Sequence, residues 1–400
     1  MKTERGNGMK RVWKSIDYSL LLPLIILCML GVIMVYSSSS IVAISRHNWP
    51  ANYFFKKQLL ALAVGTIALV VIATIPYKVW RKRIFLLGSY GISVALLAAA
   101  AFFTKKVNGA NGWIFGIQPA EFVKITVILV LAHFFAKRQE TNTPVLKGSG
   151  PVLIAVGLIM FLILKQNDLG TDLLIVGTVG IMFLCSGVRI NLWLKRIALT
   201  SIIWIPALYF LGNYALSPYQ KARFSVFLDP FNDPQKDGFQ LINSFIAIAS
   251  GELNGRGLGN SIQKYGYLPE PQTDFIMAII SEELGFIGVA IILISLLLII
   301  IRAFRIAQKC QDPFGSLLAI GIASLIGIQT FVNVGGMSGL IPLTGVPLPF
   351  VSYGGSSLLA NLIGMGILLN IASQVKREEK QQEEIKGKRE QGEPHLVLVK

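Results

Sequence analysis

The 400-residue chain is 53% hydrophobic and only 14% charged, with a mean hydropathy of +0.62. This composition excludes an ordinary soluble protein of this length and indicates a protein with many membrane spans. The formal net charge of +16 would suit a nucleic-acid-binding protein, but basic residues that gather in cytoplasmic segments explain it better, so we expect no nucleic-acid partner.

Ten apolar segments are long enough to cross a bilayer, which predicts an all-α polytopic membrane protein with ten transmembrane helices. If the N-terminus is cytoplasmic, the inside segments carry 25 Lys and Arg residues and the outside segments carry 11. This imbalance predicts that both termini are cytoplasmic. The predicted spans lie near residues 20–36, 58–75, 84–103, 119–136, 150–165, 168–187, 197–212, 275–301, 314–334 and 350–373.

Two pairs of charged residues open predicted spans four and six. Glu121 and Lys124 are three residues apart, so they share one helix face and either pair with each other or meet a ligand. Asp168 and Asp172 are four residues apart at the start of span six. Capping of the helix accounts for Asp168, whereas a second like charge at Asp172 requires a positive partner or a cation.

The connection between spans seven and eight, residues 213–274, is about sixty residues long and is predicted to be extracellular. Its apolar middle, residues 240–249, predicts a short helix in or near the membrane interface. Four basic loop residues add positive charge to this outer face, as an anionic ligand would require, namely Lys221, Arg223, Arg256 and Lys264. At the other end of the chain, residues 374–400 are predicted to form a charged cytoplasmic tail after a membrane domain of residues 1–373.

The central stretch of the sequence is residues 267–285, where a proline-containing loop enters span eight through Asp274. One interpretation makes Asp274 a helix-capping acid, and the other makes it a catalytic base. Glu282 and Glu283 follow about 12 Å further along the helix, at about 1.5 Å per residue. Carboxylates at that depth in a bilayer need partners or a polar cavity.

Ser352 and Ser356 open span ten, where small and hydroxyl residues indicate either close helix packing or a polar site. Polar residues therefore gather at the outer ends of spans four, six, eight and ten, which predicts one outward-facing polar cavity. The sequence contains no nucleotide-binding fingerprint, hydrolase nucleophile motif or zinc-protease motif. Its three cysteines and three histidines show no disulfide framework or metal-ligand spacing.

At these residues the chain resembles the SEDS family, whose members act in cell shape, elongation, division and sporulation. The resemblance covers nearly all ten spans. The segments that carry it are NGANGWIFGIQPAEFVK (108–124), QNDLGTDLL (166–174), YQKARFSVFLDPFNDPQKDGFQ (219–240), GRGLGNSIQKYGYLPEPQTDFIMAIISEELG (255–285) and GLIPLTGVPLPFVSYGGSS (339–357).

The resemblance implies a peptidoglycan glycosyltransferase that polymerises lipid II on the outer face of the cytoplasmic membrane. The essential aspartate of the family lies in a Thr-Asp-Phe triplet, which here contains Asp274. The chain departs from the family where basic residues commonly precede Trp113, because Asn111 and Gly112 stand there. We expect a substrate-binding role for nine residues, namely Trp113, Glu121, Lys124, Asp168, Arg223, Glu282, Glu283, Ser352 and Ser356.

The chemistry expected from this family is attack of a sugar hydroxyl on an anomeric carbon that carries a polyprenyl diphosphate. Asp274 would act as the general base, and Lys124, Arg223 or a divalent cation such as Mg²⁺ or Mn²⁺ would stabilise the leaving diphosphate. Similarity to the cell-division members of the family predicts a place at the septum, with a class B penicillin-binding transpeptidase and other divisome membrane proteins as partners. The alternatives are a lipid II flippase or a scaffold without catalytic activity that recruits the transpeptidase.

Overall fold

The computed structural model describes residues 17–104, 112–144, 148–187, 218–232 and 238–390. Within these ranges the protein is helical, apart from one isolated antiparallel bridge between Ile114 and Ile117. The helices are α2 (Tyr18–His47), α3 (Tyr53–Thr74), η1 (Tyr77–Arg81), α4 (Arg83–Phe103), α5 (Pro119–Glu140), α6 (Gly150–Lys165), α7 (Leu169–Leu184), α9 (Pro218–Leu228), α10 (Phe239–Gly251), α11 (Ile276–Lys309), α12 (Pro313–Met337) and α13 (Gly355–Glu390).

Seven of these helices are long and apolar enough to cross a membrane, namely α2, α3, α4, α5, α11, α12 and the larger part of α13. The shorter apolar helices α6 and α7 coincide with two more predicted spans. The protein is therefore a multi-pass membrane protein. The predicted seventh span, at 197–212, lies outside the described residues.

The local sequence explains where several helices begin and end. Asp17 caps α2 by accepting a hydrogen bond from the Ser19 amide at 3.1 Å, and Asp312 caps α12. Proline occupies the first turn of α5, α6 and α12, where its missing N–H costs no hydrogen bond. These signals fix the ends of helices whose interiors are mainly apolar.

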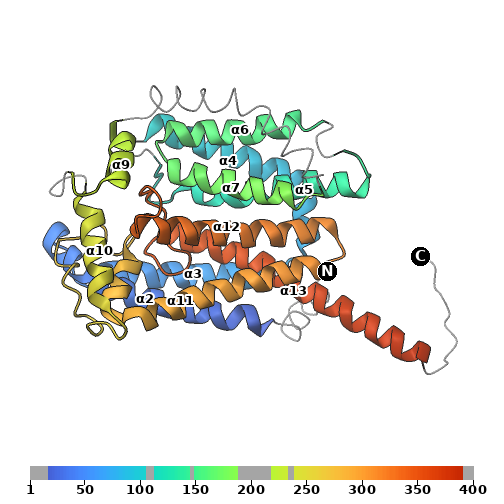
Figure 1. The fold of residues 1–400 in the computed structure, drawn as a ribbon. Coiled ribbons are helices and arrows are strands. Elements are labelled where there is room, and N and C mark those ends of the chain that lie inside the picture. The colour runs from blue at the N-terminus through green and yellow to red at the C-terminus, as the bar shows by residue number, and fades with distance from the viewer. Residues whose placement is uncertain (1–16, 105–111, 145–147, 188–217, 233–237, 391–400) are drawn as a thin grey trace.

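The helices form two groups joined by α12 (Figure 1). In one group α3 packs along α13 and α11 lies against α2, whereas in the other α4, α5, α6 and α7 pack together. Helix α12 contacts α11 in the first group and both α5 and α7 in the second. Glycines allow close approaches within the first group: a Cβ on Gly31 would lie 2.7 Å from the Phe350 carbonyl oxygen, and one on Gly366 would lie 2.9 Å from that of Leu69.

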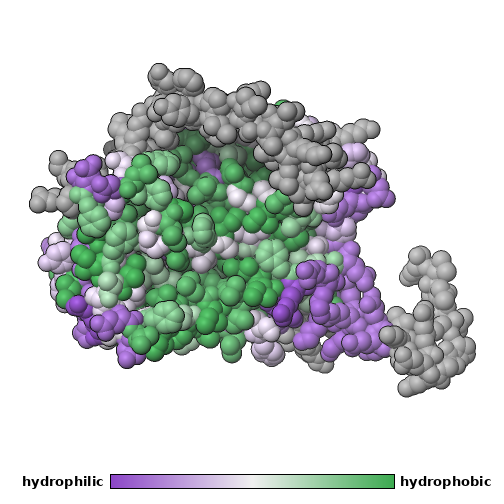
Figure 2. All heavy atoms as spheres, viewed as in Figure 1, coloured by the Kyte–Doolittle hydropathy of each residue, from purple (hydrophilic) through white to green (hydrophobic). Residues whose placement is uncertain are grey.

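The surface of the bundle is apolar around its middle and hydrophilic toward its two ends (Figure 2). Large apolar side chains such as Leu22, Ile67 and Phe286 are exposed on the described helices. Such exposure would be costly in water but suits contact with lipid tails. The surface therefore agrees with the membrane assignment made from helix length.

The loop between α9 and α11 contains the short helix predicted at 240–249, observed as α10. This helix packs on α11 and touches α12. Helix α11 changes direction at Gly285, which has a positive φ of 65° and interrupts the helical conformation. At the C-terminal end of the described chain, α13 continues to Glu390, so the predicted tail boundary at residue 374 falls inside a helix.

Candidate functional site

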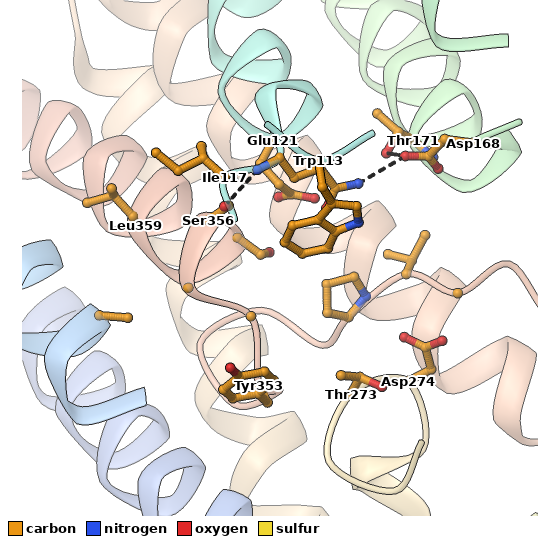
Figure 3. Close-up of a pocket in the computed structure, with 18 of the residues that line it drawn as sticks. Trp113, Ile117, Glu121, Asp168, Thr171, Thr273, Asp274, Tyr353, Ser356 and Leu359 are labelled. Atoms are coloured by element: carbon orange, nitrogen blue, oxygen red, sulfur yellow. Dashed lines mark hydrogen bonds between the residues drawn. The ribbon is translucent and has the colours of Figure 1, made fainter. Parts of the chain in front are cut away.

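A cavity of about 800 Å³ opens at the end of the bundle where α3, α5, α7 and α13 begin. The loop before α11, which carries Thr273 and Asp274, forms another part of its wall (Figure 3). Residues 344–347 and Arg223 of α9 also line the cavity. Six of the ten residues predicted from sequence to form the site line this cavity, and they come from distant parts of the chain. These six are Trp113, Glu121, Asp168, Arg223, Asp274 and Ser356.

Asp274 lies two residues before the first residue of α11, at the end of a series of turns that follows Pro269 and Pro271. The N-cap of α11 is Phe275, and no side chain caps this helix. The capping interpretation of Asp274 is therefore wrong. Its carboxylate makes no hydrogen bond with another described residue and faces the cavity.

Three hydrogen bonds hold the backbone on which Asp274 is carried, and together we name them the carbonyl clasp. The Tyr353 amide donates to the Gln272 carbonyl oxygen at 2.8 Å, and the Ser352 hydroxyl donates to that of Thr273 at 2.6 Å. The Asn333 side-chain amide donates to the Asp274 carbonyl oxygen at 3.0 Å. Three consecutive carbonyls are thus fixed by residues that lie far away in the sequence.

The carbonyl clasp changes the interpretation of Ser352, which was predicted to bind substrate. Its hydroxyl is buried and also accepts a hydrogen bond from the Leu348 amide at 2.8 Å. Both bonding directions of the hydroxyl are therefore used within the protein. Ser352 supports the Asp274 segment from behind and does not line the cavity.

Gly345 lies close to both the carboxylate of Asp274 and the guanidinium of Arg223. A Cβ on this glycine would lie 3.4 Å from Asp274 Oδ2 and 3.8 Å from both terminal nitrogens of Arg223. Its φ of +76° also disfavours any other residue. Arg223 is itself oriented by a 2.9 Å hydrogen bond from Nη1 to the Leu343 carbonyl oxygen. The acid and the cation are therefore neighbours on one wall.

Burial raises the pKa of Asp274 from its usual value to about 6, and the charge of Arg223 partly opposes this increase. The Glu270 carboxyl, which lines the same cavity, raises the pKa of Asp274 further. Burial also raises the pKa of Glu270. Asp274 is consequently a stronger base than an exposed aspartate and is still mainly ionised at neutral pH.

The wall formed by α5, α7 and α13 is joined by polar contacts around Gln118 (Figure 3). Its amide N–H donates to the Ser356 hydroxyl at 3.0 Å, and its side chain donates to Asp168 at 3.3 Å. Asp168 also caps α7 by accepting hydrogen bonds from the amide and hydroxyl of Thr171, at 2.9 and 2.8 Å. Trp113 lies beside this group and faces the cavity.

Glu121 and Lys124 form a buried ion pair with 2.8 Å between Nζ and Oε2. Glu121 lines the cavity, whereas Lys124 does not. The predicted contact of Lys124 with a ligand is therefore not supported by its position, because its charge is directed to Glu121. The structural ion pair describes Lys124 better.

Glu282 and Glu283 lie outside the cavity. They bind the glycine-rich loop that follows α10. Glu283 accepts hydrogen bonds from Lys264 at 2.8 Å and from Ser37 of α2 at 2.7 Å. Glu282 accepts from the Ile262 amide at 2.9 Å. Both glutamates are buried and fully engaged, so their predicted role in substrate binding is replaced by an anchoring one.

Sequence reasoning missed several residues of the site, among them Lys57, Glu270, Asn333 and Gly345. Lys57 and Glu270 both line the cavity. Only Glu270 lay within the 267–285 stretch that the sequence singled out, and its position four residues before Asp274 was a usable signal. Asn333 and Gly345 act through contacts between distant segments, for which one sequence carries no direct signal.

The possibility of a divalent cation stays a prediction. Within the described residues there is no group of three or more His, Cys, Asp or Glu side chains placed to hold a metal. Glu121, Asp168, Glu270 and Asp274 all line the cavity, but only Glu270 and Asp274 come from the same segment, the loop before α11. We therefore assign no chemical step to a metal.

The chain matches the family model described as "Cell cycle protein", which takes in FtsW, RodA and SpoVE, over residues 18–377. It is 46% identical over 378 residues to a Bacillus subtilis (strain 168) protein named "Probable peptidoglycan glycosyltransferase FtsW", covering 93% of this chain and 94% of that protein. It is 40% identical to the stage V sporulation protein E of the same organism, covering 90% and 97%.

Two solved structures are also similar. One chain belongs to the structure described as "Structural coordination of polymerization and crosslinking by a peptidoglycan synthase complex", with a TM-score of 0.71, 26% identity and coverage of 90% of this chain and 98% of that one. The other is RodA of Thermus thermophilus, with a TM-score of 0.63, 24% identity and coverage of 90% and 97%, which supports the fold alone. The chain therefore belongs to the FtsW, RodA and SpoVE family of cell cycle proteins.

Proposed function

We propose that this protein is a peptidoglycan glycosyltransferase that polymerises lipid II at the outer face of the cytoplasmic membrane, with Asp274 as the general base. The observation that carries the proposal is the position of the Asp274 carboxylate. It faces a cavity, is free of hydrogen bonds with the described residues, and lies beside Arg223. The curated relatives named as peptidoglycan glycosyltransferases support the reaction class.

In this reaction Asp274 removes the proton from the acceptor sugar hydroxyl while the hydroxyl oxygen bonds to the anomeric carbon of the donor. The bond from that carbon to the polyprenyl diphosphate breaks, and the diphosphate leaves with the electron pair. Direct displacement inverts the configuration at the carbon. A pKa near 6 suits the base, because the carboxylate is ionised at pH 7 yet takes a proton more readily than an exposed one.

Arg223 serves the base in this scheme. Its positive charge next to Asp274 favours the ionised carboxylate, which limits the increase in pKa caused by burial. We propose that Trp113, Glu121, Asp168 and Ser356 bind the polar parts of the substrates, because all four line the cavity.

The flippase alternative requires a polar route through the whole bundle. The cavity occupies one end, and the parts of α5, α11 and α12 that lie further from it are mainly apolar. A scaffold without activity would not require an acid with an altered pKa in a cavity. Both features favour a polymerase.

We also propose that the protein works at the division septum with a class B penicillin-binding transpeptidase and other divisome membrane proteins. The family description "Cell cycle protein" supports the division role. The similar chain from a complex that joins polymerisation with crosslinking supports a transpeptidase partner. In this arrangement the cavity faces outward, and both chain termini, with the charged tail at 374–400, are cytoplasmic.

The test supplies purified protein and its transpeptidase partner with lipid II and measures glycan chains by gel electrophoresis. We expect chains from the wild type and none from Asp274→Asn. Asp229→Asn is the matched control, because the same substitution there alters an exposed side chain away from the cavity. Glycan chains made at equal rates by wild type and Asp274→Asn would refute the base assignment.

A further inference from the structure

We propose that Lys57 and the apolar face of α3 next to it bind the diphosphate and the first isoprene units of the donor lipid. The proposal rests on the proposed glycosyltransferase function and names the substrate group that each part of the cavity takes. Lys57, Leu60, Ala61 and Val64 all line the cavity from α3. No ligand role was predicted for any of them.

The chemistry of displacement sets where the leaving diphosphate must lie. In an inverting reaction the attacking oxygen and the leaving oxygen are on opposite faces of the anomeric carbon. The base contacts the attacking hydroxyl, so the leaving group points away from Asp274. Arg223 is next to Asp274 across Gly345 and is therefore on the wrong side to receive the diphosphate. A second cation is needed elsewhere in the cavity.

Lys57 meets this requirement. In the described chain the basic residues that line the cavity are Arg223 and Lys57. Two buried lysines near this end of the bundle are neutralised within the protein, since Lys124 pairs with Glu121 and Lys264 pairs with Glu283. Lys57 forms no ion pair with a carboxylate in the part of the chain that the structure describes, and its side chain is exposed. An unneutralised cation that faces a cavity favours an anionic ligand.

Aromatic contacts fix the position of Lys57. Its Nζ lies 4.5 Å from the centre of the Tyr53 ring, and that ring packs 4.1 Å from Trp49. The next residue of α3, Phe54, contacts Tyr353 edge-to-face at 5.0 Å between ring centres. Because the Tyr353 amide belongs to the carbonyl clasp, the segment that carries Asp274 and the helix that carries Lys57 are packed through one residue.

The residues that follow Lys57 on the same helix face are apolar. Leu60, Ala61 and Val64 lie three, four and seven positions further along, and this spacing places them on one face of a helix. Leu60 is 66% exposed and Val64 is 47% exposed. The same face continues to Ile67, which is also 66% exposed. A cation at the cavity end of an exposed apolar face complements a phosphate group that carries a hydrocarbon chain.

Both the donor lipid and an ordinary phospholipid carry a phosphate group on a hydrocarbon chain. A binding experiment can distinguish between these two ligands. The donor is favoured because the cation lies in the same cavity as Asp274. A phospholipid that binds only to the outer surface of α3 would not need a cation in the cavity that contains Asp274.

The test measures binding of undecaprenyl diphosphate to purified protein in nanodiscs, for wild type, Lys57→Met, Lys57→Arg and Lys56→Met. Lys56 is the matched control, since it is the preceding exposed lysine and does not line the cavity. Loss of one charge-assisted contact should weaken binding about 10- to 100-fold in Lys57→Met. Lys57→Arg should recover most of the affinity and Lys56→Met should bind like the wild type.

Two further measurements test the contribution of the isoprene chain and distinguish the donor lipid from an ordinary phospholipid. Geranyl diphosphate should bind more weakly than undecaprenyl diphosphate, and Leu60→Ser should reduce that difference. Phosphatidylglycerol that competes as well as undecaprenyl diphosphate would overturn the donor assignment. Wild-type binding by Lys57→Met, with Asp274→Asn still inactive, would refute this inference and leave the proposed function intact. Lys57-dependent binding without any polymerisation by wild-type protein would refute the function instead.

Discussion

Asp274 and the pair Glu282 and Glu283 lie within nine residues of one another, yet the protein treats them in opposite ways. Asp274 has its backbone held by three hydrogen bonds and its carboxylate left toward the cavity. The glutamates have their carboxylates held by Ser37, Lys264 and backbone amides. A carboxylate without hydrogen bonds on a fixed backbone is suited to accept a proton from a substrate. A carboxylate with all its hydrogen bonds made is suited to hold a loop in place.

The difference arises from what each acid meets across the fold. Glu283 reaches Ser37 on α2 and Lys264 in the loop, so its charge is neutralised in the protein. Asp274 meets Gly345, which contributes no side chain and leaves room for a ligand beside the carboxylate. A side chain at position 345 would occupy space next to the Asp274 carboxylate.

The largest expected effect comes from Asp274→Asn. The amide keeps the shape of the side chain but cannot accept the proton, so we expect polymerisation to fall by about 100-fold or more. Protein yield and melting temperature should not change. Glu282→Gln is the control within the same segment. Any decrease in its activity should equal the decrease in the amount of folded protein. Equal activity per folded molecule in Asp274→Asn and Glu282→Gln would remove the distinction between the two acids.

Glu283→Ala should instead act on stability. It leaves the buried Lys264 ammonium without its carboxylate, which costs about 3–5 kcal/mol. We expect a lower melting temperature in detergent, with the remaining folded protein still able to polymerise. Replacing both residues, Glu283→Met with Lys264→Met, should regain much of the stability because no charge is left buried alone. A normal melting temperature for Glu283→Ala would show that the anchor carries little energy.

The pH dependence of the wild type tests the state of Asp274. Only the ionised carboxylate is a base, and its pKa of about 6 predicts that activity is half-maximal near pH 6. Activity should fall about tenfold for each further unit of decreasing pH. Arg223→Gln removes the charge that lowers this pKa, so the midpoint should move to higher pH. A midpoint that stays in place in Arg223→Gln, or one near pH 4 in the wild type, would contradict this electrostatic account.

The smallest expected effect comes from loosening the carbonyl clasp. Ser352→Ala and Asn333→Leu each remove one hydrogen bond to the Asp274 segment, which should lower the polymerisation rate about three- to tenfold. A carboxylate that gains water should also titrate at lower pH, so the acid midpoint should decrease. Ser324→Ala is the control, since that buried hydroxyl bonds within its own helix. A reduced rate with an unmoved midpoint would mean that these residues act on folding alone.

The sequence was sufficient to predict the helices at the nine expected spans that the described residues cover, and the convergence of polar residues at one end. Successive spans cross the membrane in alternate directions, so spans four, six, eight and ten all start on the same side. Polar residues at the starts of these spans are therefore expected to lie at one end of the bundle. The short helix α10 was also predictable, since an apolar run inside a long polar loop has few other structures open to it.

The direction of each side chain was not predictable in the same way. Four polar residues are of types common in binding sites, but each is bonded to a partner within the protein and does not line the cavity. They are Lys124, Ser352, Glu282 and Glu283. Ser37, for example, is 246 positions from Glu283 in the chain. Lys57 was missed for the converse reason, because a lysine beside aromatic residues at the start of a span is typical of any membrane interface.

Helix α13 gives the cavity a mechanical connection to the other side of the membrane. Its first turns contribute Ser356 and Leu359 to the cavity wall, and the helix then runs unbroken to Glu390. At about 1.5 Å per residue its 36 residues extend roughly 54 Å. A rod of that length works as a lever: a tilt of about one degree displaces its ends by about 1 Å relative to each other. A tilt of α13 caused by a force at its far end therefore moves Ser356 and Leu359 at the rim of the cavity.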